Sequence, residues 1–301
     1  MPSLDSHLVL VELLALIPFL AAGFFSVRFT GCAQSWPRWV QIAAPSLLAV
    51  LYVLVARNAN IFSWEWLAVY LFLPAALAAV LRFAPPAGLY WTQLLILLGL
   101  GLAVVLGLFD SAWPQHLAVF NRFLLLDLAI YLFVALRPIE DAGFDLRLRF
   151  RDVAIGLREF IFCFPLLLLA GFALRFVHPH TFSSGLTIKQ ALFEAGQFVV
   201  EWVRIFFFIA VPEELFFRGW LQNLFERRMG REPALFLVAA LFGLSHFSHY
   251  NSPGAFFNWR YVLLAAIAGI FYGRAWRAQR RVGASAITHA TLDAVWSLWL
   301  R

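Results

Sequence analysis

The sequence predicts an all-α, polytopic transmembrane helical bundle of about eight to ten spans. Of its 301 residues, 62% are hydrophobic and 13% are charged, whereas soluble domains have about 45–50% apolar and about 25% charged residues. Apolar runs of about 20 residues, the length that crosses a bilayer, recur along the whole chain. Tryptophan and tyrosine recur near the ends of these runs, as is typical of membrane interfaces. We therefore expect an integral, multi-pass membrane protein, in the plasma membrane if the host is bacterial.

Eleven helical segments are expected, in chain order. They lie at residues 8–29, 38–56, 64–81, 90–109, 117–136, 158–177, 192–210, 212–228, 233–247, 261–276 and 284–300. The first has acidic residues near its start instead of a basic region, so we expect a retained span and not a cleaved signal peptide. Tryptophan or tyrosine lies near the start of the second, third, fourth and tenth of these segments. Pro212 separates the seventh and eighth, which form either one bent helix or a span followed by a shorter helix.

The net charge of +6 does not indicate nucleic-acid binding. The arginines lie at the ends of apolar runs, where the positive-inside rule places them, so the clusters at 147–158, 227–231 and 274–281 are expected on the cytoplasmic side. We expect no nucleic-acid partner. The two cysteines, Cys32 and Cys163, form neither a CxxC motif nor a disulfide framework.

The polar stretch at residues 137–152 is the best candidate for a domain boundary. The apolar runs before it carry few charges and no motif. The runs after it contain the charged pairs and histidines that suggest chemistry. We therefore interpret residues 1–150 as an N-terminal transmembrane scaffold and residues 151–301 as the functional core.

Three groups of polar residues interrupt the apolar runs in the last third of the chain. They are Glu213-Glu214-x-x-x-Arg218, Phe242-x-x-x-His246 with His249 just beyond it, and His289-x-x-x-Asp293. An ionisable side chain in the bilayer costs about 2.5–3.5 kcal/mol on insertion scales, so such groups persist where they pair or do chemistry. Glu214 and Arg218 lie one helical turn apart and are expected to pair. Glu213, rotated by ~100°, then faces a different neighbour.

The spacing places these groups at similar depth. Glu213 lies 14 residues before Arg227, and His246 lies 15 residues after Arg231. Two antiparallel helices that turn near Gly230 would bring both side chains to about 20 Å from the turn, at 1.5 Å per residue. We therefore expect the polar groups to converge near the middle of the bilayer and not at its surface.

Glutamate and histidine side chains at such a depth suit two kinds of hydrolytic chemistry. A buried carboxylate in contact with water is a candidate general base, and histidines opposite it can donate hydrogen bonds to a tetrahedral oxyanion. Asp293, four residues after His289, is suited to orient that ring. The alternative is a zinc site in which Glu213, His246 and His289 hold the ion and the ion activates the water. The first interpretation requires no cofactor, and the zincin sequence H-E-x-x-H is absent.

In order and approximate spacing, the three groups resemble the motifs of the CPBP family of intramembrane proteases. That family includes the type II CAAX-prenyl endopeptidases and the bacterial Abi proteins. Its pattern is E-E-x-x-x-R, then F-x-x-x-H, then H-x-x-x-N or D. The chain reads EELFFR at 213–218, FGLSH at 242–246 and HATLD at 289–293. The resemblance covers about residues 193–299, and it rests on three motifs in order, each within an apolar run.

The resemblance implies an intramembrane endopeptidase of glutamic type or a metalloendopeptidase, with residues 151–301 as its core. By position it implies a water-activating Glu213, an assisting His246, an oxyanion site of His289 and Asp293, and a supporting ion pair of Glu214 and Arg218. Many members have asparagine in place of Asp293. An ionised Asp293 would repel an oxyanion, so we expect it either to carry a proton or only to orient His289. His249 is expected at a loop or behind the site.

Two functions of other classes stay open. Intramembrane Glu, His and Asp side chains also form proton relays, so a proton-coupled membrane transporter is one alternative. The concentration of polar groups in one third of the chain counts against it, because many transporters repeat such features in both halves. A non-catalytic immunity or scaffold protein that retains the motifs is the other. The expected partners are the lipid bilayer and a membrane-associated protein or peptide substrate, and no residue specifies whether that substrate is prenylated.

Overall fold

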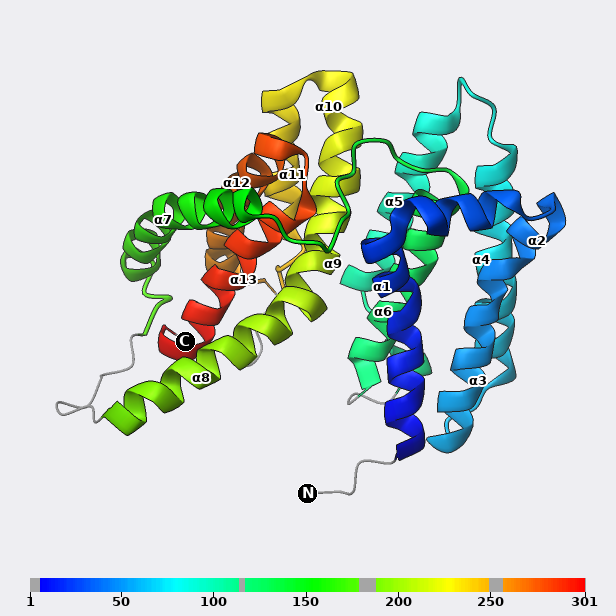
Figure 1. Cartoon of the computed structure of the whole chain (residues 1–301), viewed down its shortest axis with the longest axis horizontal. Helices are drawn as coiled ribbons and strands as arrows, with labels where there is room; N and C mark the ends of the chain where they lie inside the picture. The colour runs from blue at the N-terminus through cyan, green and yellow to red at the C-terminus, as the bar shows by residue number, and fades with distance from the viewer. Residues whose placement is uncertain (1–5, 114–116, 179–187, 249–256, 301) are drawn as a thin grey trace. The chain divides into compact units, whose positions relative to one another are not determined.

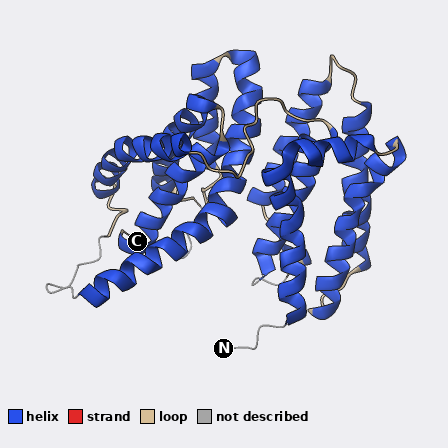
Figure 2. Cartoon of the chain, in the orientation of Figure 1, coloured by secondary structure: helices blue, strands red, loops and turns tan. Residues whose placement is uncertain are grey.

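The computed structural model describes residues 6–113, 117–178, 188–248 and 257–300, and all the regular elements in these ranges are helices (Figure 2). The predicted all-α fold is confirmed. Five described stretches are long and apolar enough to cross a membrane, namely Leu14–Ser35, Arg38–Asn58, Trp64–Phe83, Phe150–Ala173 and Leu192–Met229. The chain is therefore an integral, multi-pass membrane protein. The other predicted spans are also helices, and their crossing of the bilayer stays a prediction.

The chain divides into two compact units, Met1–Glu140 and Asp141–Arg301. The helices of the first unit are α1 (Ser6–Ser35), α2 (Arg38–Ala43), η1 (Ala44–Leu47), α3 (Leu48–Asn58), α4 (Trp64–Phe83), α5 (Leu89–Val105), η2 (Asp110–Ala112), α6 (Ala118–Ile130) and η4 (Tyr131–Leu136) (Figure 1). Its buried polar contacts include Trp113 Nε1, which donates to Tyr70 Oη at 2.8 Å, and Tyr70 Oη, which donates to Asn121 Oδ1 at 3.0 Å. The scaffold role predicted for residues 1–150 stays a prediction.

The second unit contains the three polar motifs. Its helices are α7 (Phe150–Ala173), α8 (Ile188–Ile205), η5 (Phe206–Ala210), α9 (Val211–Glu214), η6 (Leu215–Gln222), α10 (Asn223–Met229), α11 (Arg231–Leu244), α12 (Trp259–Gln279) and α13 (Val282–Trp299). The elements from α8 to α10 follow one another without a break. Of the two alternatives for the chain around Pro212, the structure has the single long helical stretch.

The start of α7 differs from the prediction. A loop was expected at 147–158 and a helix from 158, but the helix begins at Phe150. The cause is a local cap, because the Arg149 backbone N–H donates to Oδ2 of Asp152 at 2.9 Å. A carboxylate in the first turn also faces the positive end of the helix dipole. The arginines at 151 and 158 therefore lie on a helix.

Helix α13 is the centre of the second unit. Its first ten residues, from Val282 to Thr291, are all buried. Small side chains let the neighbouring backbones approach, as is typical of helix packing in membranes. A Cβ on Gly156 of α7 would lie 2.6 Å from Cγ2 of Ile287 of α13, so only glycine fits there. Figure 1 shows α13 (red) between α7 and α8.

Residues 142–147 bind the turn between α12 and α13. Arg281 donates to Asp152 at 2.8 Å, to Asp145 at 3.1 Å and to the Arg147 carbonyl at 2.8 Å. Burial alone would raise the pKa of Asp145, but hydrogen bonds from Arg147 and Arg281 outweigh it and hold that pKa below its ordinary value. Gly143 adopts φ +73°, and any Cβ there would overlap the Arg280 carbonyl. This polar stretch is thus part of the second unit.

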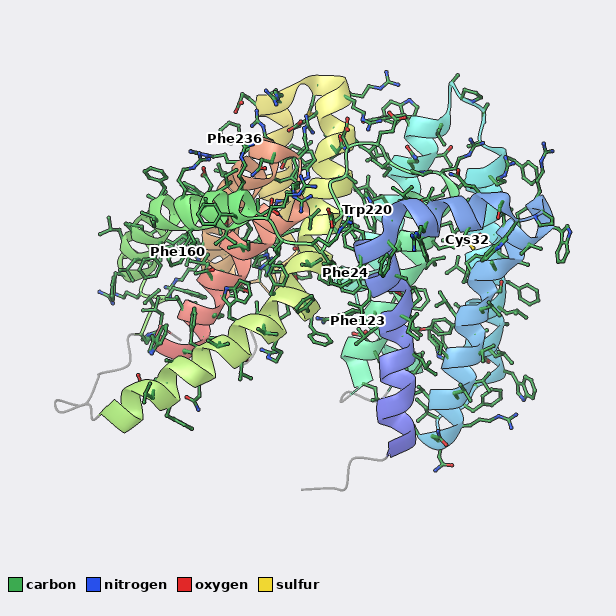
Figure 3. The ribbon with its side chains drawn as sticks, viewed as in Figure 1. Phe24, Cys32, Phe123, Phe160, Trp220 and Phe236 are labelled. Atoms are coloured by element: carbon green, nitrogen blue, oxygen red, sulfur yellow. The ribbon has the colours of Figure 1, made fainter. Side chains whose placement is uncertain are left out.

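Apolar side chains also cover the outside of the helices (Figure 3). Trp220 is fully buried, whereas Phe236 on α11 and Phe162 on α7 are 56% and 59% exposed. Exposed phenylalanine on a helix that lies in lipid needs no protein partner. The second unit thus has apolar side chains both in its core and on its outer surface.

Candidate active site

The two adjacent glutamates lie on an irregular part of the long helical stretch. Turns of π-helix precede them at Phe206–Ala210 and follow them at Leu215–Gln222. Pro212 has no N–H to donate within the helix, which favours such a local rearrangement. Single π-turns inside α-helices are frequent at functional sites. This geometry buries Glu214 completely and leaves the Glu213 side chain 34% exposed.

Glu214 and Arg218 form an ion pair that has no exposure to solvent. Nη1 of Arg218 lies 3.0 Å from Oε1 of Glu214, and both side chains are 0% exposed. Nη2 of Arg218 donates to the Gly269 carbonyl at 3.0 Å. The guanidinium also lies over the Phe242 ring, 4.5 Å from its centroid, where the π-face attracts a cation. The buried charge is therefore paired, hydrogen-bonded and packed.

His289 joins the motifs to one another. Its Nδ1 lies 2.8 Å from Oε1 of Glu214. Its Nε2 lies 3.4 Å from Oδ2 of Asp293 and 3.9 Å from Oε2 of Glu213. The Tyr272 ring of α12 stacks on the imidazole, with centroids 4.6 Å apart and planes at 12°. Three carboxylates and one aromatic face thus fix the position of the ring.

His246 follows the last turn of α11 and is buried. Its Nδ1 lies 2.8 Å from the Phe242 carbonyl oxygen, one turn back. A carbonyl oxygen only accepts, so Nδ1 is assigned as the donor in this bond. The Phe242 ring packs against both histidines, with centroids 4.8 Å from His246 and 5.7 Å from His289. The F-x-x-x-H spacing therefore places the Phe242 carbonyl where it orients His246 and the Phe242 ring where it packs against both histidines.

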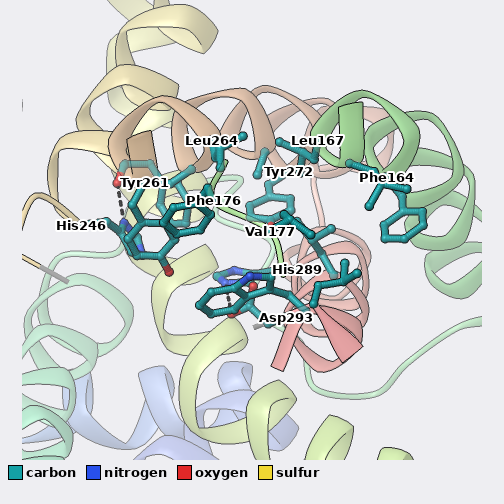
Figure 4. Close-up of a pocket in the computed structure, with 17 residues that line it drawn as sticks. Phe164, Leu167, Phe176, Val177, His246, Tyr261, Leu264, Tyr272, His289 and Asp293 are labelled. Atoms are coloured by element: carbon teal, nitrogen blue, oxygen red, sulfur yellow. Dashed lines mark hydrogen bonds and ion pairs between the residues drawn. The ribbon is translucent and has the colours of Figure 1, made fainter. Parts of the chain in front are cut away.

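One cavity of about 80 Å³ joins the two histidines and Asp293 (Figure 4). A single water molecule needs about 10–15 Å³ of such volume, so the cavity has room for several. Most of the wall is apolar or aromatic, and it includes Tyr261 and Tyr272 of α12. Glu213 is not among the described residues that line it.

Glu213 nevertheless has one oxygen directed inward. Its Oε2 is buried and receives no hydrogen bond from the described residues. Its distance to Nε2 of His289 is 3.9 Å, which is too long for a direct hydrogen bond. Glu213 and Asp293 are each about one third exposed. The carboxylate is thus both desolvated on one side and reachable on the other.

Three of the predicted site residues, Glu213, His289 and Asp293, lie together. His246 lines the same cavity as His289 and Asp293. His249 lies outside the described residues. The roles given to them stay predictions. Sequence reasoning missed Tyr272 and Ser285, which touch His289 and Glu214. The position of Ser285, one helical turn before His289, was the only signal for either of them.

The residues do not fit the alternative zinc site. Among the described residues, no three His, Cys, Asp or Glu side chains are arranged to hold a metal ion. Both ring nitrogens of His289 face carboxylates, Glu214 on one side and Asp293 on the other. A zinc ligand needs a ring nitrogen directed at the ion.

The match to known proteins covers the same part of the chain. Residues 195–295 match the family model described as type II CAAX prenyl endopeptidase Rce1-like. All four predicted catalytic residues, and the Glu214–Arg218 pair, fall within these residues. No curated protein and no solved structure matches the chain. The resemblance predicted from the three motifs is thus confirmed for about the last third of the chain.

Proposed function

We propose, from the premise that residues 195–295 form an Rce1-like type II CAAX prenyl endopeptidase domain, that the protein is an intramembrane endopeptidase. It hydrolyses a peptide bond of a membrane-associated or lipidated substrate. The observation that carries this proposal is the position of His289, between Glu214, Asp293 and Glu213, beside a cavity that His246 also lines. Buried ionisable groups in a membrane are costly, which favours a functional role for this cluster.

Glu213 is proposed as the general base. Its inward oxygen has no hydrogen bond from the described residues and lies 3.9 Å from Nε2 of His289. We place the attacking water beside these two groups, where it can bond to both. A carboxylate next to such a water can take its proton as the oxygen attacks a carbonyl carbon. The proton then passes to the leaving amine.

The two histidines are proposed to stabilise the oxyanion that this attack forms. His289 donates through Nδ1 to Glu214, and its Nε2 faces the carboxylate of Asp293. Two acceptors on opposite sides favour hydrogen on both nitrogens, so the ring is positively charged, and this charge stabilises the nearby oxyanion. His246 faces the same cavity, and because its Nδ1 hydrogen is bonded to the Phe242 carbonyl, it donates to the oxyanion through Nε2 in its doubly protonated form. Asp293 then serves to orient His289, and not as a direct partner of the oxyanion.

The substrate is proposed to reach the site from the membrane. The cavity is small, about 80 Å³, and its wall is mostly apolar. It holds several waters or one side chain, which suits the residues around a scissile bond. The family name implies a prenylated substrate, and the size of the cavity does not require one. A lipidated and an unlipidated peptide are therefore both needed in the test.

The test is peptide cleavage by the full-length protein in liposomes. Two peptides of one sequence, with and without a prenylated cysteine, are incubated with it and the products are identified by mass spectrometry. We expect Glu213→Gln to lower the cleavage rate by about 10²–10⁴, the contribution of a general base. Glu232→Gln is the matched control, because Glu232 is 67% exposed and pairs with Arg277 away from the site. Cleavage by Glu213→Gln at the wild-type rate would refute the proposal.

A further inference from the structure

We infer that Ser285 is a positioning residue for hydrolysis, which acts through Glu214 on His289; this inference rests on the function proposed above. Ser285 lies near the start of α13, one turn before His289, and is 0% exposed. Its hydroxyl donates to Oε2 of Glu214. It belongs to none of the three motifs, and it touches no part of the cavity that a substrate would enter.

The two oxygens of Glu214 have different partners. Oε1 accepts from Nη1 of Arg218 at 3.0 Å and from Nδ1 of His289 at 2.8 Å. Oε2 accepts from Ser285, and the described residues supply it with no other hydrogen bond. The last torsion of a glutamate side chain has a broad, shallow preference. Ser285 supplies the hydrogen bond that holds the second oxygen, and together with the two bonds to Oε1 it fixes the plane of the carboxylate.

The single hydrogen of Ser285 has two acceptors within reach. Besides Glu214, the Tyr272 carbonyl oxygen lies 2.9 Å from the hydroxyl. That carbonyl is inside α12, where the helical ladder supplies a donor. Glu214 is the buried counter-charge of Arg218, and a bond to an ionised acceptor is about twice as strong as a neutral one. The hydrogen therefore points to Glu214.

This bond connects the elements that carry the site. Glu214 belongs to α9, Ser285 and His289 to α13, and Tyr272, which stacks on His289, to α12. One carboxylate thus reaches two successive turns of α13, through Oε2 at Ser285 and through Oε1 at His289. Without the hydroxyl we expect the Glu214 carboxylate to rotate and its hydrogen bond with Nδ1 of His289 to weaken. Nε2 of His289 then shifts from its present position. A shift of about 1 Å in a catalytic group can cost about 10²-fold in rate.

The experiment compares steady-state cleavage by four full-length variants in liposomes. Ser285→Ala is expected to lower kcat by about 10- to 100-fold, the scale for one hydrogen bond to a charged group. KM is expected to stay within about twofold, because the cavity wall is unchanged. Ser285→Cys retains a weak donor and is expected to recover part of kcat. Thr288→Val is the matched control, since it removes a buried hydroxyl of the same helix that bonds to the Gly156 carbonyl and not to Glu214. Glu213→Gln is the reference for the proposed function.

The outcomes separate the two proposals. Wild-type kcat in Ser285→Ala, with Glu213→Gln inactive, would overturn the role of Ser285 and leave the proposed function intact. An equal loss in Thr288→Val would also overturn it, because the effect would then follow from any lost buried hydroxyl. Cleavage by Glu213→Gln at the wild-type rate would overturn the proposed function itself. If Ser285→Ala is not recovered folded, Ser285→Cys decides, with reduced kcat at constant KM supporting the inference and wild-type kcat contradicting it.

Discussion

At the scale of single residues, the buried charge of Arg218 is tolerated because both of its Nη atoms are hydrogen-bonded. Arg218 bonds to Glu214 and to the Gly269 carbonyl and lies over the Phe242 ring. Glu214 in turn accepts from His289 and Ser285. The spacing of E-E-x-x-x-R predicted the ion pair, because residues i and i+4 share a helix face. No spacing rule predicted Gly269 or Phe242, since they come from other helices and meet Arg218 only through packing.

The first prediction at this scale concerns the stability of the ion pair. Arg218→Met keeps most of the side-chain volume but leaves Glu214 buried without its counter-charge. We expect a loss of about 3–5 kcal/mol, the usual cost of breaking a buried pair from one side. Arg147→Met is the control, because Arg147 is 67% exposed and its pair with Asp145 is worth less than about 1 kcal/mol. Unfolding of the detergent-solubilised protein measures both, and equal losses in the two variants would contradict the assignment.

At the scale of helices, close approach explains which segments carry the site. Helices α11 and α12 meet where Gly243 faces Val262 and Ala266. His246 follows three residues later, so the fit of these two helices sets its position. The apolar runs predicted nearly every helix, because in lipid each spanning segment must satisfy its own backbone. The start of α7 and the π-turns around Pro212 were not predicted, since one depends on the Asp152 cap and the other on packing.

Gly243→Ala tests this close approach. A Cβ at Gly243 would overlap the Val262 carbonyl oxygen and lie 2.7 Å from Cβ of Ala266. We expect overpacking to destabilise the protein by about 1–3 kcal/mol and to lower the cleavage rate by displacing His246. Gly196→Ala in α8 is the control, because a Cβ there meets nothing within 4 Å. That change is expected to be neutral or to stabilise the helix by up to about 1 kcal/mol. Thermal unfolding and cleavage assays are made on both, and a Gly243→Ala protein as stable and active as the Gly196→Ala protein would count against the packing argument.

At the scale of the whole molecule, chemistry is concentrated in the second unit. The three motifs, the cavity and the family match all lie between residues 164 and 300. The order of the three motifs was readable in the sequence, and the matching depth of Glu213 and His246 stays a prediction. The position of His289 between three carboxylates could not be predicted from the sequence, because it depends on how α13 packs against α9. The first unit carries no motif, and its scaffold role stays a prediction.

The central claim is that water attacks the peptide carbonyl directly, with no covalent intermediate on the enzyme. The most direct measurement is cleavage in isotopically labelled water that also contains hydroxylamine, a nucleophile that traps acyl-enzymes. The account predicts one labelled oxygen in the new carboxyl group and no hydroxamate, because the proposed base acts on water and no acyl-enzyme forms. A hydroxamate at the cleaved carbonyl would mean that a side chain is the nucleophile, and would contradict the account.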